Sequence, residues 1–571
     1  MISIKNEIAK KLKENIEFLT IEELEAMIEI PQESSMGDYA FPCFKLAKEL
    51  HKAPPMIAAD IAEKLSGDLF DKVQNVNAYV NIFINKKSFA KLTLEEVAIA
   101  ENKYGNTNVG DGKRVIVEYS SPNIAKPFHI GHIRSTVIGH SIAKIYDALG
   151  YDVFRINHLG DYGTQFGKMI VAYRKWGNED EVKNAPIKSL LSYYVKFHQE
   201  ADKDPSLEDE ARETFTKLEH GEKAEVELWQ WFREESLKEF NRVYGMLGIS
   251  FDSYNGESFY SDKMPAVLEE LKAKNLLKES QGAQIVDLEE YGMTPALITK
   301  SDGSSLYITR DLAAAFYRKK TYDFVKCIYV VASQQNLHFQ QWFKVLELMG
   351  YDWYKDCVHI PFGLVSMEDG TMSTRDGRVV FLEDVLNKAV EKTKEIVLEK
   401  NVNTENVDET AAMVGIGAVM FNELSNSRIK DYVFNWDKVL NFDGETGPYV
   451  QYTHARAASV LRNANFDFES AKKSLDSVDF SFVTGDSAYE LIKLLYRFPD
   501  AVIKAGEEYE PSVVTRHIID VAQAFNKFYH DEHIIVEDEK EKQAKLILTW
   551  AAKQTLKNGL ALLGIKAPEK M

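Results

Sequence analysis

Two histidines, His129 and His132, stand three residues apart where a helical pattern begins. This spacing puts both imidazoles on one helical face, so they are able to contact the same ligand. Backbone N–H groups and the helix dipole at such a position attract phosphate, and Gly131 lets a base or ribose approach the backbone. Donors aimed at a phosphate stabilise the charge that develops in an in-line displacement. The pair therefore indicates chemistry on a phosphoryl group.

Two other interpretations of the pair stay open. The histidines are also spaced to bind zinc, which needs a third ligand near by, and His158 and Asp161 are candidates for it. Alternatively, the two side chains are ordinary polar residues of a helix. An isolated pair of histidines at this spacing would favour that second interpretation.

A strand, a loop, a helix and a second strand position the histidines. Apolar runs cover residues 114–119 and 152–157, and a helical pattern covers residues 133–149 between them. This order predicts a βαβ unit of a parallel sheet, in which ligands bind outside the carboxyl ends of the strands. The glycine-rich loop at residues 158–167 follows the second strand, and we expect it to contact substrate. It matches neither the P-loop nor the GxGxxG motif, and a plain connection with turn glycines is its alternative interpretation.

The pattern of elements predicts three domains. Residues 1–105 combine helical periodicity with an alternating strand pattern at 77–85, which is typical of an α+β module. Residues 112–440 alternate strands with helices around a helical insertion at about 180–245, which indicates an α/β domain. Residues 441–571 show helical spacing and predict an all-α domain.

Composition and charge limit the function class. The 571-residue chain has a net charge of −19, which alone argues against a nucleic-acid partner. Residues 113–176 are locally basic, however, with nine Lys or Arg against four Asp or Glu, as a polyanion site would be. Sampling noise along a long chain is the other explanation of this local excess.

The chain carries no sign of export or membrane insertion. Its first helical pattern is amphipathic and contains acidic residues, unlike a signal peptide. No apolar run approaches the roughly 20 residues that cross a bilayer. The three cysteines, Cys43, Cys327 and Cys357, lack metal or redox spacing. We therefore expect a cytoplasmic protein with no membrane partner.

The segment around the histidines resembles a known family signature. The sequence FHIGH after SSPN is similar to the HIGH motif of class I aminoacyl-tRNA synthetases and related nucleotidyltransferases. Five longer segments resemble arginyl-tRNA synthetase over essentially the whole chain: SSPNIAKPFHIGHIRST, HLGDYGTQFG, LYITRDLAAAFYR, GPYVQYTHARAASVLR and LGIKAPEKM. The resemblance implies a Rossmann-like class I catalytic domain, an N-terminal module that contacts the tRNA elbow, and a C-terminal anticodon-binding domain.

In that resemblance, both histidines contact the phosphates of ATP during adenylate formation. The second class signature, KMSKS, corresponds to residues 371–375, where Met372 and Ser373 match but Thr371 replaces the first lysine. The second lysine is replaced by Thr374 or shifted to Arg375. Members of the family often lack a full KMSKS, and a lysine before HIGH is thought to compensate, which implicates Lys126. Gly160 and Asp161 of the glycine-rich loop complete the expected ATP contacts.

The resemblance also implies an arginine pocket. Its expected residues are Glu118 and Asn123 before HIGH, Tyr307 and Asp311 four apart at a strand–helix turn, and Gln335 three before His338. The physical chemistry agrees, because carboxylates bind a guanidinium in a planar, bidentate geometry. Ordinary structural roles remain the alternative for single residues: Glu118 could pair with Arg134, and Asp311 could cap a helix.

Candidate tRNA contacts follow from the two outer domains. Tyr79 and Asn81 correspond to the positions that contact the tRNA elbow, and an aromatic ring with an amide suits single-stranded loops. Core packing is the other interpretation of Tyr79. In the C-terminal domain, spacing puts Tyr449, Tyr452 and Arg456 on one helical face, and Tyr509 is a further candidate.

The implied reaction has two steps. Arginine is activated with ATP and Mg²⁺, without a dedicated protein metal site, and is then transferred to the 2′-hydroxyl at the 3′ end of arginine tRNA. The family further implies that tRNA binds before activation and that the enzyme is a monomer. Two alternatives remain: a small-molecule nucleotidyltransferase, which would not need the outer domains, and a non-catalytic tRNA-binding paralogue, suggested by the incomplete KMSKS.

Overall fold

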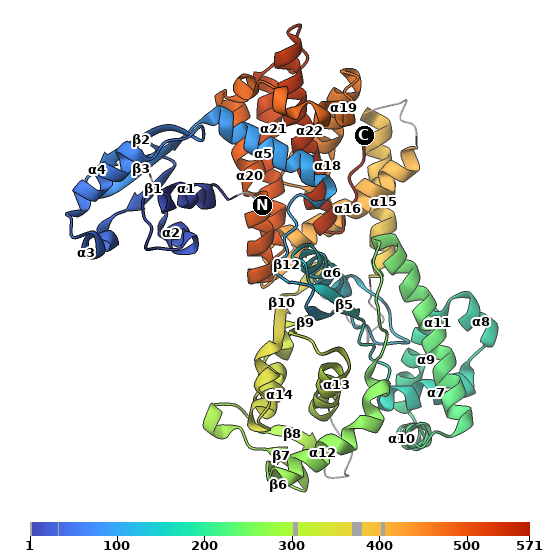
Figure 1. Cartoon of the computed structure of the whole chain (residues 1–571). Coiled ribbons are helices and arrows are strands. Elements are labelled where there is room, and N and C mark those ends of the chain that lie inside the picture. Colours follow the sequence, from blue (N-terminus) through green and yellow to red (C-terminus); the bar gives the residue numbers. More distant parts are fainter. Residues whose placement is uncertain (1–2, 32, 301–306, 368–379, 401–405) are drawn as a thin grey trace.

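The computed structural model describes the chain apart from residues 1–2, 32, 301–306, 368–379 and 401–405. Figure 1 shows the N-terminal module and a group of helices in the middle of the chain on opposite sides of a small central sheet. The C-terminal helices pack at one end of this sheet, and a second α/β region lies at the other end.

The N-terminal module contains the predicted strand as the centre of a small antiparallel sheet. The strand order is β1-β3-β2, so the two neighbours of β3 both pair with it. The side chain of Ser3 caps the first helix by accepting from the N–H of Asn6. The elements of the module are α1 (Ile4–Lys13), α2 (Ile21–Met27), β1 (Tyr39–Pro42), α3 (Ala47–Leu50), α4 (Pro54–Lys64), β2 (Phe70–Val76) and β3 (Tyr79–Ile84).

Helix α5 (Lys86–Ala100) follows the N-terminal module in sequence. It lies among the C-terminal helices rather than on the antiparallel sheet of that module (Figure 1). Its Phe89 ring makes edge contacts with Tyr489, at 5.7 Å between ring centroids, and with Tyr496, at 5.1 Å. Aromatic pairs of this geometry add to the energy of simple apolar burial. Helix α5 therefore joins the first domain to the last.

The central sheet is parallel, as the βαβ pattern predicts. Its strand order is β10-β9-β4-β5, and every pair in it is parallel. Helix α6 (Ile133–Ala148) connects the two strands that the sequence pattern identifies. A Cβ on Gly139 of this helix would lie 2.2 Å from Cβ of Tyr119, so glycine permits the close crossing. The strands are β4 (Arg114–Glu118), β5 (Asp152–Ile156), β9 (Lys326–Ala332) and β10 (Cys357–Phe362).

Five helices between β5 and β6 form a group with its own apolar core. The group begins at α7, earlier than the position of about 180 expected from the charge pattern. Met169 and Ile170 of α7 share a core with Leu190 of α9 and Phe232 of α11, which explains the earlier start. The helices are α7 (Thr164–Trp176), α8 (Glu179–Asn184), α9 (Pro186–Ala201), α10 (Ser206–Glu219) and α11 (Lys223–Leu247).

The second half of the α/β region adds an antiparallel sheet, in the order β6-β7-β8, and two helices that flank β9 in sequence. Its elements are α12 (Met264–Ala273), β6 (Leu277–Ser280), β7 (Ala283–Val286), β8 (Ala296–Thr299), α13 (Tyr307–Tyr322) and α14 (Asn336–Leu348). Two short strands beyond β10 form a separate parallel pair, β11 (Val365–Met367) and β12 (Tyr432–Phe434).

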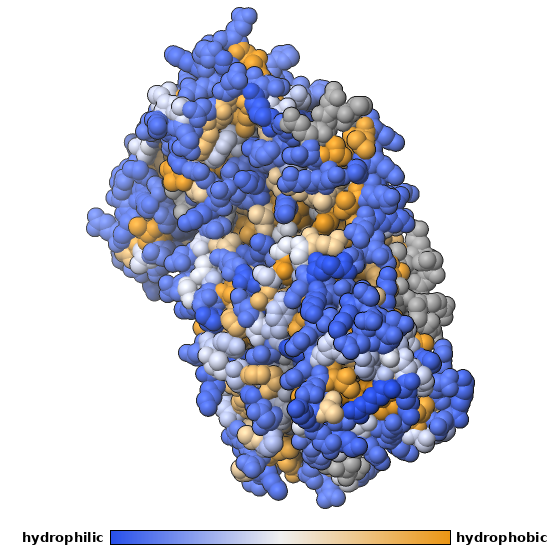
Figure 2. Space-filling model, turned by 90° about the vertical axis from the view of Figure 1, so that its right-hand side faces the viewer, coloured by the Kyte–Doolittle hydropathy of each residue, from blue (hydrophilic) through white to orange (hydrophobic). Residues whose placement is uncertain are grey.

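The described chain beyond β11 is helical apart from β12. Its helices are α15 (Leu382–Lys400), α16 (Val407–Ser425), α17 (Trp436–Val439), α18 (Gly447–Asn463), α19 (Phe468–Lys473), α20 (Asp486–Glu508), α21 (Ser512–Asp531) and α22 (Glu539–Leu562). Of these, α18 to α22 lie within residues 441–571, for which the sequence pattern predicts an all-α domain. No helix within the described part of the chain is long and apolar enough to cross a bilayer. The face in Figure 2 is mostly hydrophilic, with apolar side chains in separate patches.

All three cysteines of the chain are buried and unpaired. Burial raises the pKa of the Cys43 thiol to about 12 and that of Cys327 to about 11. The pKa of the Cys357 thiol is also raised, first by burial and then by the neighbouring Cys327. The thiols are therefore protonated small apolar groups of the core.

A buried pair of side chains joins α6 to α16. Arg134, two residues after His132, and Glu423 are both fully buried, with Arg134 Nε 3.4 Å from Glu423 Oε2. Arg134 also donates to the carbonyls of Lys430, at 2.7 Å, and Arg428, at 3.2 Å. Burial raises the pKa of Glu423 to about 8, although Arg134 acts in the opposite direction. Glu423 is therefore mostly protonated at neutral pH.

We expect the stability of the protein to fall as the pH rises toward 8, because Glu423 ionises inside the fold. The folded-state pKa lies above the ordinary value of about 4.3, so the proton bound to Glu423 stabilises the fold at low pH and is lost through pH 8. Glu423→Gln, which resembles the protonated acid, should match the wild type in thermal unfolding at pH 4 and exceed it at pH 8.5. The exposed Glu227→Gln serves as control, and an equal difference at both pH values would contradict the assignment.

Candidate active site at the amino end of α6

The two histidines lie against each other at a single turn, Ile130–His132, which His129 caps and which precedes α6. His129 Nδ1 accepts from the N–H of Gly131 at 3.0 Å, and His132 Nδ1 accepts from the N–H of His129 at 3.2 Å. The ring centroids are 4.0 Å apart. Because each Nδ1 is an acceptor, each neutral ring carries its proton on Nε2. The site therefore holds two imidazoles with the same fixed tautomer.

Both imidazoles are neutral at physiological pH. Burial lowers the pKa of His129, and it lowers that of His132 to about 3, with smaller contributions from His129 and Lys126. A neutral imidazole is still able to donate a hydrogen bond from Nε2. The pair thus offers donors without adding positive charge.

The backbone N–H groups of this turn are used within the chain. Ile130 N donates to the carbonyl of Val380 at 3.1 Å, and His132 N donates to the carbonyl of His129 at 2.9 Å. Gly131 N donates to the imidazole of His129. This differs from the expectation that these N–H groups face a phosphate, because the turn is closed by side-chain and long-range acceptors. The Nε2–H groups of the two imidazoles are therefore the donors that this turn offers to a ligand.

A segment far along the chain runs beside the histidines. Leu382 N donates to the carbonyl of Phe128 at 3.0 Å, and an antiparallel bridge joins His129 to Phe381. This segment directly follows residues 368–379. The predicted ATP contacts Met372, Ser373 and Arg375 lie outside the described residues, and the chain that leaves them is fixed next to His129.

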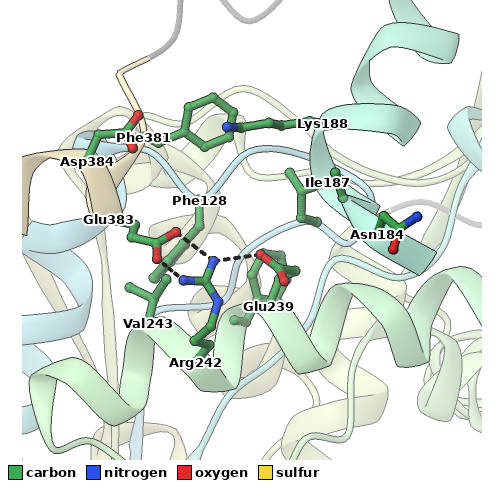
Figure 3. Close-up of a pocket in the computed structure, with 12 residues that line it drawn as sticks. Phe128, Asn184, Ile187, Lys188, Glu239, Arg242, Val243, Phe381, Glu383 and Asp384 are labelled. Atoms are coloured by element: carbon green, nitrogen blue, oxygen red, sulfur yellow. Dashed lines mark hydrogen bonds and ion pairs between the residues drawn. The ribbon is translucent and has the colours of Figure 1, made fainter. Parts of the chain in front are cut away.

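A cavity of about 360 Å³ lies beside this segment, with Phe128 and Phe381 in its lining (Figure 3). Arg242 of α11 bridges its two sides: Nη2 donates to Glu239 of the same helix at 2.8 Å and to Glu383 of α15 at 2.6 Å. The Nζ atom of Lys188 lies 5.6 Å from the centroid of the Phe381 ring. These contacts hold the start of α15 against the inserted helices.

The two predicted substrate loops meet at the carboxyl ends of β4 and β5. Asn123 and Gly160 form a bridge, in which Ile124 N donates to the carbonyl of Gly160 at 3.2 Å. Gly160 N donates in turn to the carbonyl of Pro122 at 3.1 Å. Asn123 itself is exposed, so this bridge presents its amide to solvent.

Asp161 is only 1% exposed, and its carboxylate is used within the chain. Its oxygens accept from Arg233 Nε at 3.1 Å and from the N–H of Ser258 at 2.8 Å. His158 lies 3.3 Å from the guanidinium of Arg318. Both candidate third ligands for zinc thus have other partners, and the described residues contain no group of three potential metal ligands. The assignment of Gly160 and Asp161 to ATP stays a prediction.

Glu118 pairs with an arginine of the chain itself. Its Oε2 lies 2.5 Å from Nη2 of Arg318 on α13, and both side chains are buried. The alternative pairing of Glu118 with Arg134 is wrong, because Arg134 faces Glu423. Burial of an acid needs such a partner, and Arg318 supplies it.

Three other predicted arginine contacts remain open to solvent. Tyr307 and Asp311 share one face of α13, with Tyr307 65% exposed and the Asp311 side chain 31% exposed. Asp311 Oδ2 lies 2.5 Å from His338 Nε2. Gln335 is exposed in the turn that follows β9, the neighbour of β4 in the sheet. The geometry therefore leaves Asp311 as the accessible carboxylate of this group.

Sequence reasoning missed a second internal ion pair next to Asp311. Arg310 Nη1 lies 3.1 Å from Glu257 Oε2, and the guanidinium lies 4.8 Å from the centroid of the Tyr162 ring. Burial, followed by Asp311 and Asp161, raises the pKa of Glu257 to about 7, against the effect of Arg310. Glu257 lies in a polar stretch without a motif, so the sequence held no signal for it.

The candidate anticodon residues share one surface of the helical domain. Arg456 lies over the Tyr452 ring at 4.9 Å from its centroid and donates to Asn526 Oδ1 at 2.6 Å. Asn526 Nδ2 donates to the hydroxyl of Tyr449 at 3.0 Å. The guanidinium of Arg456 also lies 5.5 Å from the ring centroid of Tyr529, which is 44% exposed. The predicted common face is confirmed, and α21 adds Asn526 and Tyr529, which the spacing on α18 could not reveal.

The other candidate tRNA residues have partners within the chain. Tyr79 is half-buried and makes an edge contact with the exposed ring of Phe44. Asn81 is only 3% exposed, and its amide donates to the sulfur of Met36 at 3.8 Å. Tyr509 stacks on Tyr146 of α6. Contact of these residues with tRNA stays a prediction.

Comparison with known families covers nearly the whole chain. The model described as "tRNA synthetases class I (R), catalytic domain" matches residues 93–436. The "DALR anticodon binding domain" matches residues 450–571, and the "Arginyl tRNA synthetase N terminal domain" matches residues 3–84. The three matches follow the order of the three domains described above.

Individual relatives agree with these families. Arginine–tRNA ligases of Halothermothrix orenii and Clostridioides difficile are each 60% identical, and the matches cover 100% of both chains in each case. The solved arginyl-tRNA synthetase of Thermus thermophilus is 25% identical, with a TM-score of 0.78 over 100% of this chain and 99% of that one. The enzyme of Plasmodium falciparum gives 25% identity and a TM-score of 0.77. The chain therefore belongs to the arginyl-tRNA synthetase family, the ligases that charge tRNA with arginine in translation.

Proposed function

We propose that the chain charges arginine tRNA through two displacements at this site. The carboxylate of arginine attacks the α-phosphorus of ATP, and the bond to pyrophosphate breaks. The 2′-hydroxyl of the terminal ribose of tRNA then attacks the carbonyl carbon of the adenylate, and AMP leaves. The observation that carries the proposal is the pair of neutral imidazoles with fixed tautomers at the carboxyl edge of the parallel sheet.

In this proposal, His129 and His132 donate from Nε2 to phosphate oxygens. Their Nδ1 atoms are held by backbone N–H groups, so little reorganisation is needed when charge moves onto the pyrophosphate. Preorganised donors of this kind stabilise the transition state more than the ground state. The rings stabilise the transition state because their Nε2–H dipoles are already in position. The step needs no covalent nucleophile of the enzyme.

Lys126 and Arg375 are proposed to supply positive charge to the phosphates. Lys126 stands three residues before His129, and its ammonium lies 5.9 Å from the centroid of the Tyr194 ring on α9. The segment beginning at Val380 is anchored beside His129, which supports a position near ATP for Met372, Ser373 and Arg375. A planar guanidinium and an ammonium are not equivalent here, because only the first binds phosphate bidentately.

We propose that Mg²⁺ enters the site bound to ATP and partly neutralises the negative charge of the phosphates. The described residues offer no cluster of three potential metal ligands, and the carboxylate of Asp161 is engaged by Arg233 and Ser258. This donor set fits the usual mode in which Mg²⁺ is bound mainly by substrate phosphates and water.

For the amino acid, we assign the guanidinium to Asp311 and Tyr307, with Asn123 and Gln335 as further polar contacts. Asp311 is the accessible carboxylate of the group, and His338 orients it. Glu118 is proposed as a further contact, with its charge shared with Arg318. Carboxylate geometry then favours arginine over lysine, whose ammonium forms no planar pair of bonds.

For tRNA, we assign the elbow to Tyr79 and Asn81 and the anticodon to Tyr449, Tyr452 and Arg456. The exposed Tyr452 ring, stacked with a guanidinium, suits an unpaired base. We keep Tyr509 as a further tRNA candidate, in a turn that already contacts α6 through Tyr146 and β9 through Lys326. We further propose a cytoplasmic monomer in which tRNA binds before arginine is activated.

The activation step provides the direct test of this function. We expect labelled pyrophosphate to exchange into ATP only with arginine among the twenty amino acids, and only when arginine tRNA is present. Exchange with arginine in the absence of tRNA would contradict the proposed order of binding. Binding of tRNA with no exchange would instead indicate a non-catalytic tRNA-binding protein.

His132→Ala should reduce the turnover of activation by about 10²- to 10³-fold, the effect of losing one preorganised donor. The KM for arginine should change by less than about twofold, because the contact forms mainly in the transition state. Steady-state exchange over a range of arginine concentrations measures both values. The exposed His220→Ala is the matched control. A raised KM with normal turnover would move His132 into the amino-acid pocket.

Gly160→Ala tests the role of the bridge between the two loops. The added Cβ would lie 1.9 Å from Asn123 Oδ1, so this amide must move. If Asn123 contacts arginine, the KM for arginine should rise about tenfold, as for the loss of a hydrogen bond to a charged group. Gly245→Ala is the control, since its Cβ meets nothing within 4 Å. A normal KM in Gly160→Ala would remove Asn123 from the pocket.

A further inference from the structure

The short segment between α16 and β12 contacts three separate parts of the molecule. The carbonyl of Arg428 accepts from Arg134 Nη2 of α6 at 3.2 Å and from the N–H of Gly363, just beyond β10, at 2.8 Å. The N–H of Arg428 faces both carboxylate oxygens of Glu510 at 3.4 Å. The backbone at Arg428 thus touches the histidine-bearing helix, the sheet and the helical domain.

The side chain of Arg428 also contacts two of these parts, the sheet and the helical domain. Its Nη1 donates to the carbonyl of Pro361 at the end of β10, at 2.9 Å. Its Nε donates to the carbonyl of Tyr509 at 3.1 Å. One guanidinium therefore joins the catalytic sheet to the turn between α20 and α21. A lysine at this position would be a point charge on a flexible stem, without a rigid fork that fixes two acceptors at once.

The turn that Arg428 holds also contacts the far end of α6. The Tyr509 ring stacks on Tyr146 at 6.1 Å between centroids, and its hydroxyl accepts from Lys326 Nζ of β9 at 2.6 Å. The hydroxyl of Tyr146 donates to the carbonyl of Gly506 at 3.2 Å. Tyr509 itself ends α20 with a φ of 52°, so the turn is tightly defined. Helix α6 is thus tied to this turn at its last helical turn, and through Arg428 at its first.

These contacts connect to two segments beside the predicted phosphate site, the start of α6 and the segment at Phe381. Helix α6 begins at the two histidines. Beyond β10, the chain that Arg428 contacts at Pro361 runs through β11 to residues 368–379 and returns beside His129 at Phe381. A shift of the α20–α21 turn relative to the sheet would therefore act on the start of α6, through Arg428 and Arg134, and on the end of β10, through Arg428 and Pro361.

We propose that Arg428 is a positioning residue for arginine activation, which couples the α20–α21 turn of the tRNA-binding helical domain to the two histidines. The reaction that it serves is the one proposed above, but the coupling is a separate claim. Its physical basis is the guanidinium of Arg428, which donates to one carbonyl in each of two domains.

The test measures arginine-dependent pyrophosphate exchange by the full chain at increasing concentrations of arginine tRNA. In Arg428→Lys we expect turnover at saturating tRNA to fall about 10- to 100-fold, the usual effect of a small misplacement of reacting groups. The tRNA concentration at half-maximal rate and the affinity for tRNA in a filter-binding assay should stay within about twofold. A merely structural role would lower turnover only in proportion to the folded fraction, which thermal unfolding reports.

Arg462→Lys is the matched control, because Arg462 also donates to a carbonyl, that of Glu569, but far from the sheet. It should keep normal turnover. Glu510→Gln provides a second variant should Arg428→Lys fold poorly, since it weakens the same junction without loss of volume. In the double variant, the losses should not add, because both changes break one junction.

Normal turnover in both Arg428→Lys and Glu510→Gln would overturn the proposal, and so would turnover losses that add in the double variant. A loss of tRNA affinity equal to the loss of turnover would also overturn it, since Arg428 would then act in binding. Failure of the proposed function is distinguishable, because it appears as absent exchange in the unaltered protein.

Discussion

The buried guanidinium of Arg134 is the constraint on which the site depends. It sits two residues after His132, is fully buried, and has donors committed to the carbonyls of Lys430 and Arg428. A buried charge that loses its partners costs several kcal/mol, so α6 is not able to shift relative to the segment that follows α16 without a large penalty. The histidines therefore keep one position relative to this segment, and Arg428 within it contacts Glu510 and Tyr509 of the helical domain. Catalytic geometry in this chain is a property of the domain interface as much as of the sheet.

Local patterns were sufficient to predict the elements that position the site. The apolar runs at 114–119 and 152–157 correspond to β4 and β5, and the helical pattern at 133–149 corresponds to α6. Such periodicity depends on neighbours a few residues away, which the sequence displays directly. The partners of individual side chains were not predictable in this way. Glu118 pairs with Arg318, and Ile130 N bonds to Val380, across 200 or more residues, and no spacing rule reports such contacts.

The electrostatics of the candidate amino-acid pocket follow from the same long-range pairing. Helix α13 carries two arginines that are nearly buried, Arg310 and Arg318, and each takes a carboxylate that would otherwise attract a cationic substrate. What remains accessible is Asp311, oriented by His338. Most of the local negative charge is thus already neutralised, and a guanidinium finds one directed acceptor rather than a diffuse acidic surface. Residue identity alone, which counts every acid equally, could not make this distinction.

The three buried cysteines have a practical consequence. Thiolates, not thiols, react with maleimides and iodoacetamides, and burial holds the pKa of Cys43 near 12 and that of Cys327 near 11. The pKa of Cys357 is raised as well. Cysteines introduced on exposed helices would therefore be the thiols that react rapidly under native conditions. Fluorescent dyes attached in this way, one on α20 and one on α11, would report the separation of the helical domain and the inserted helices without any need to remove the native cysteines first.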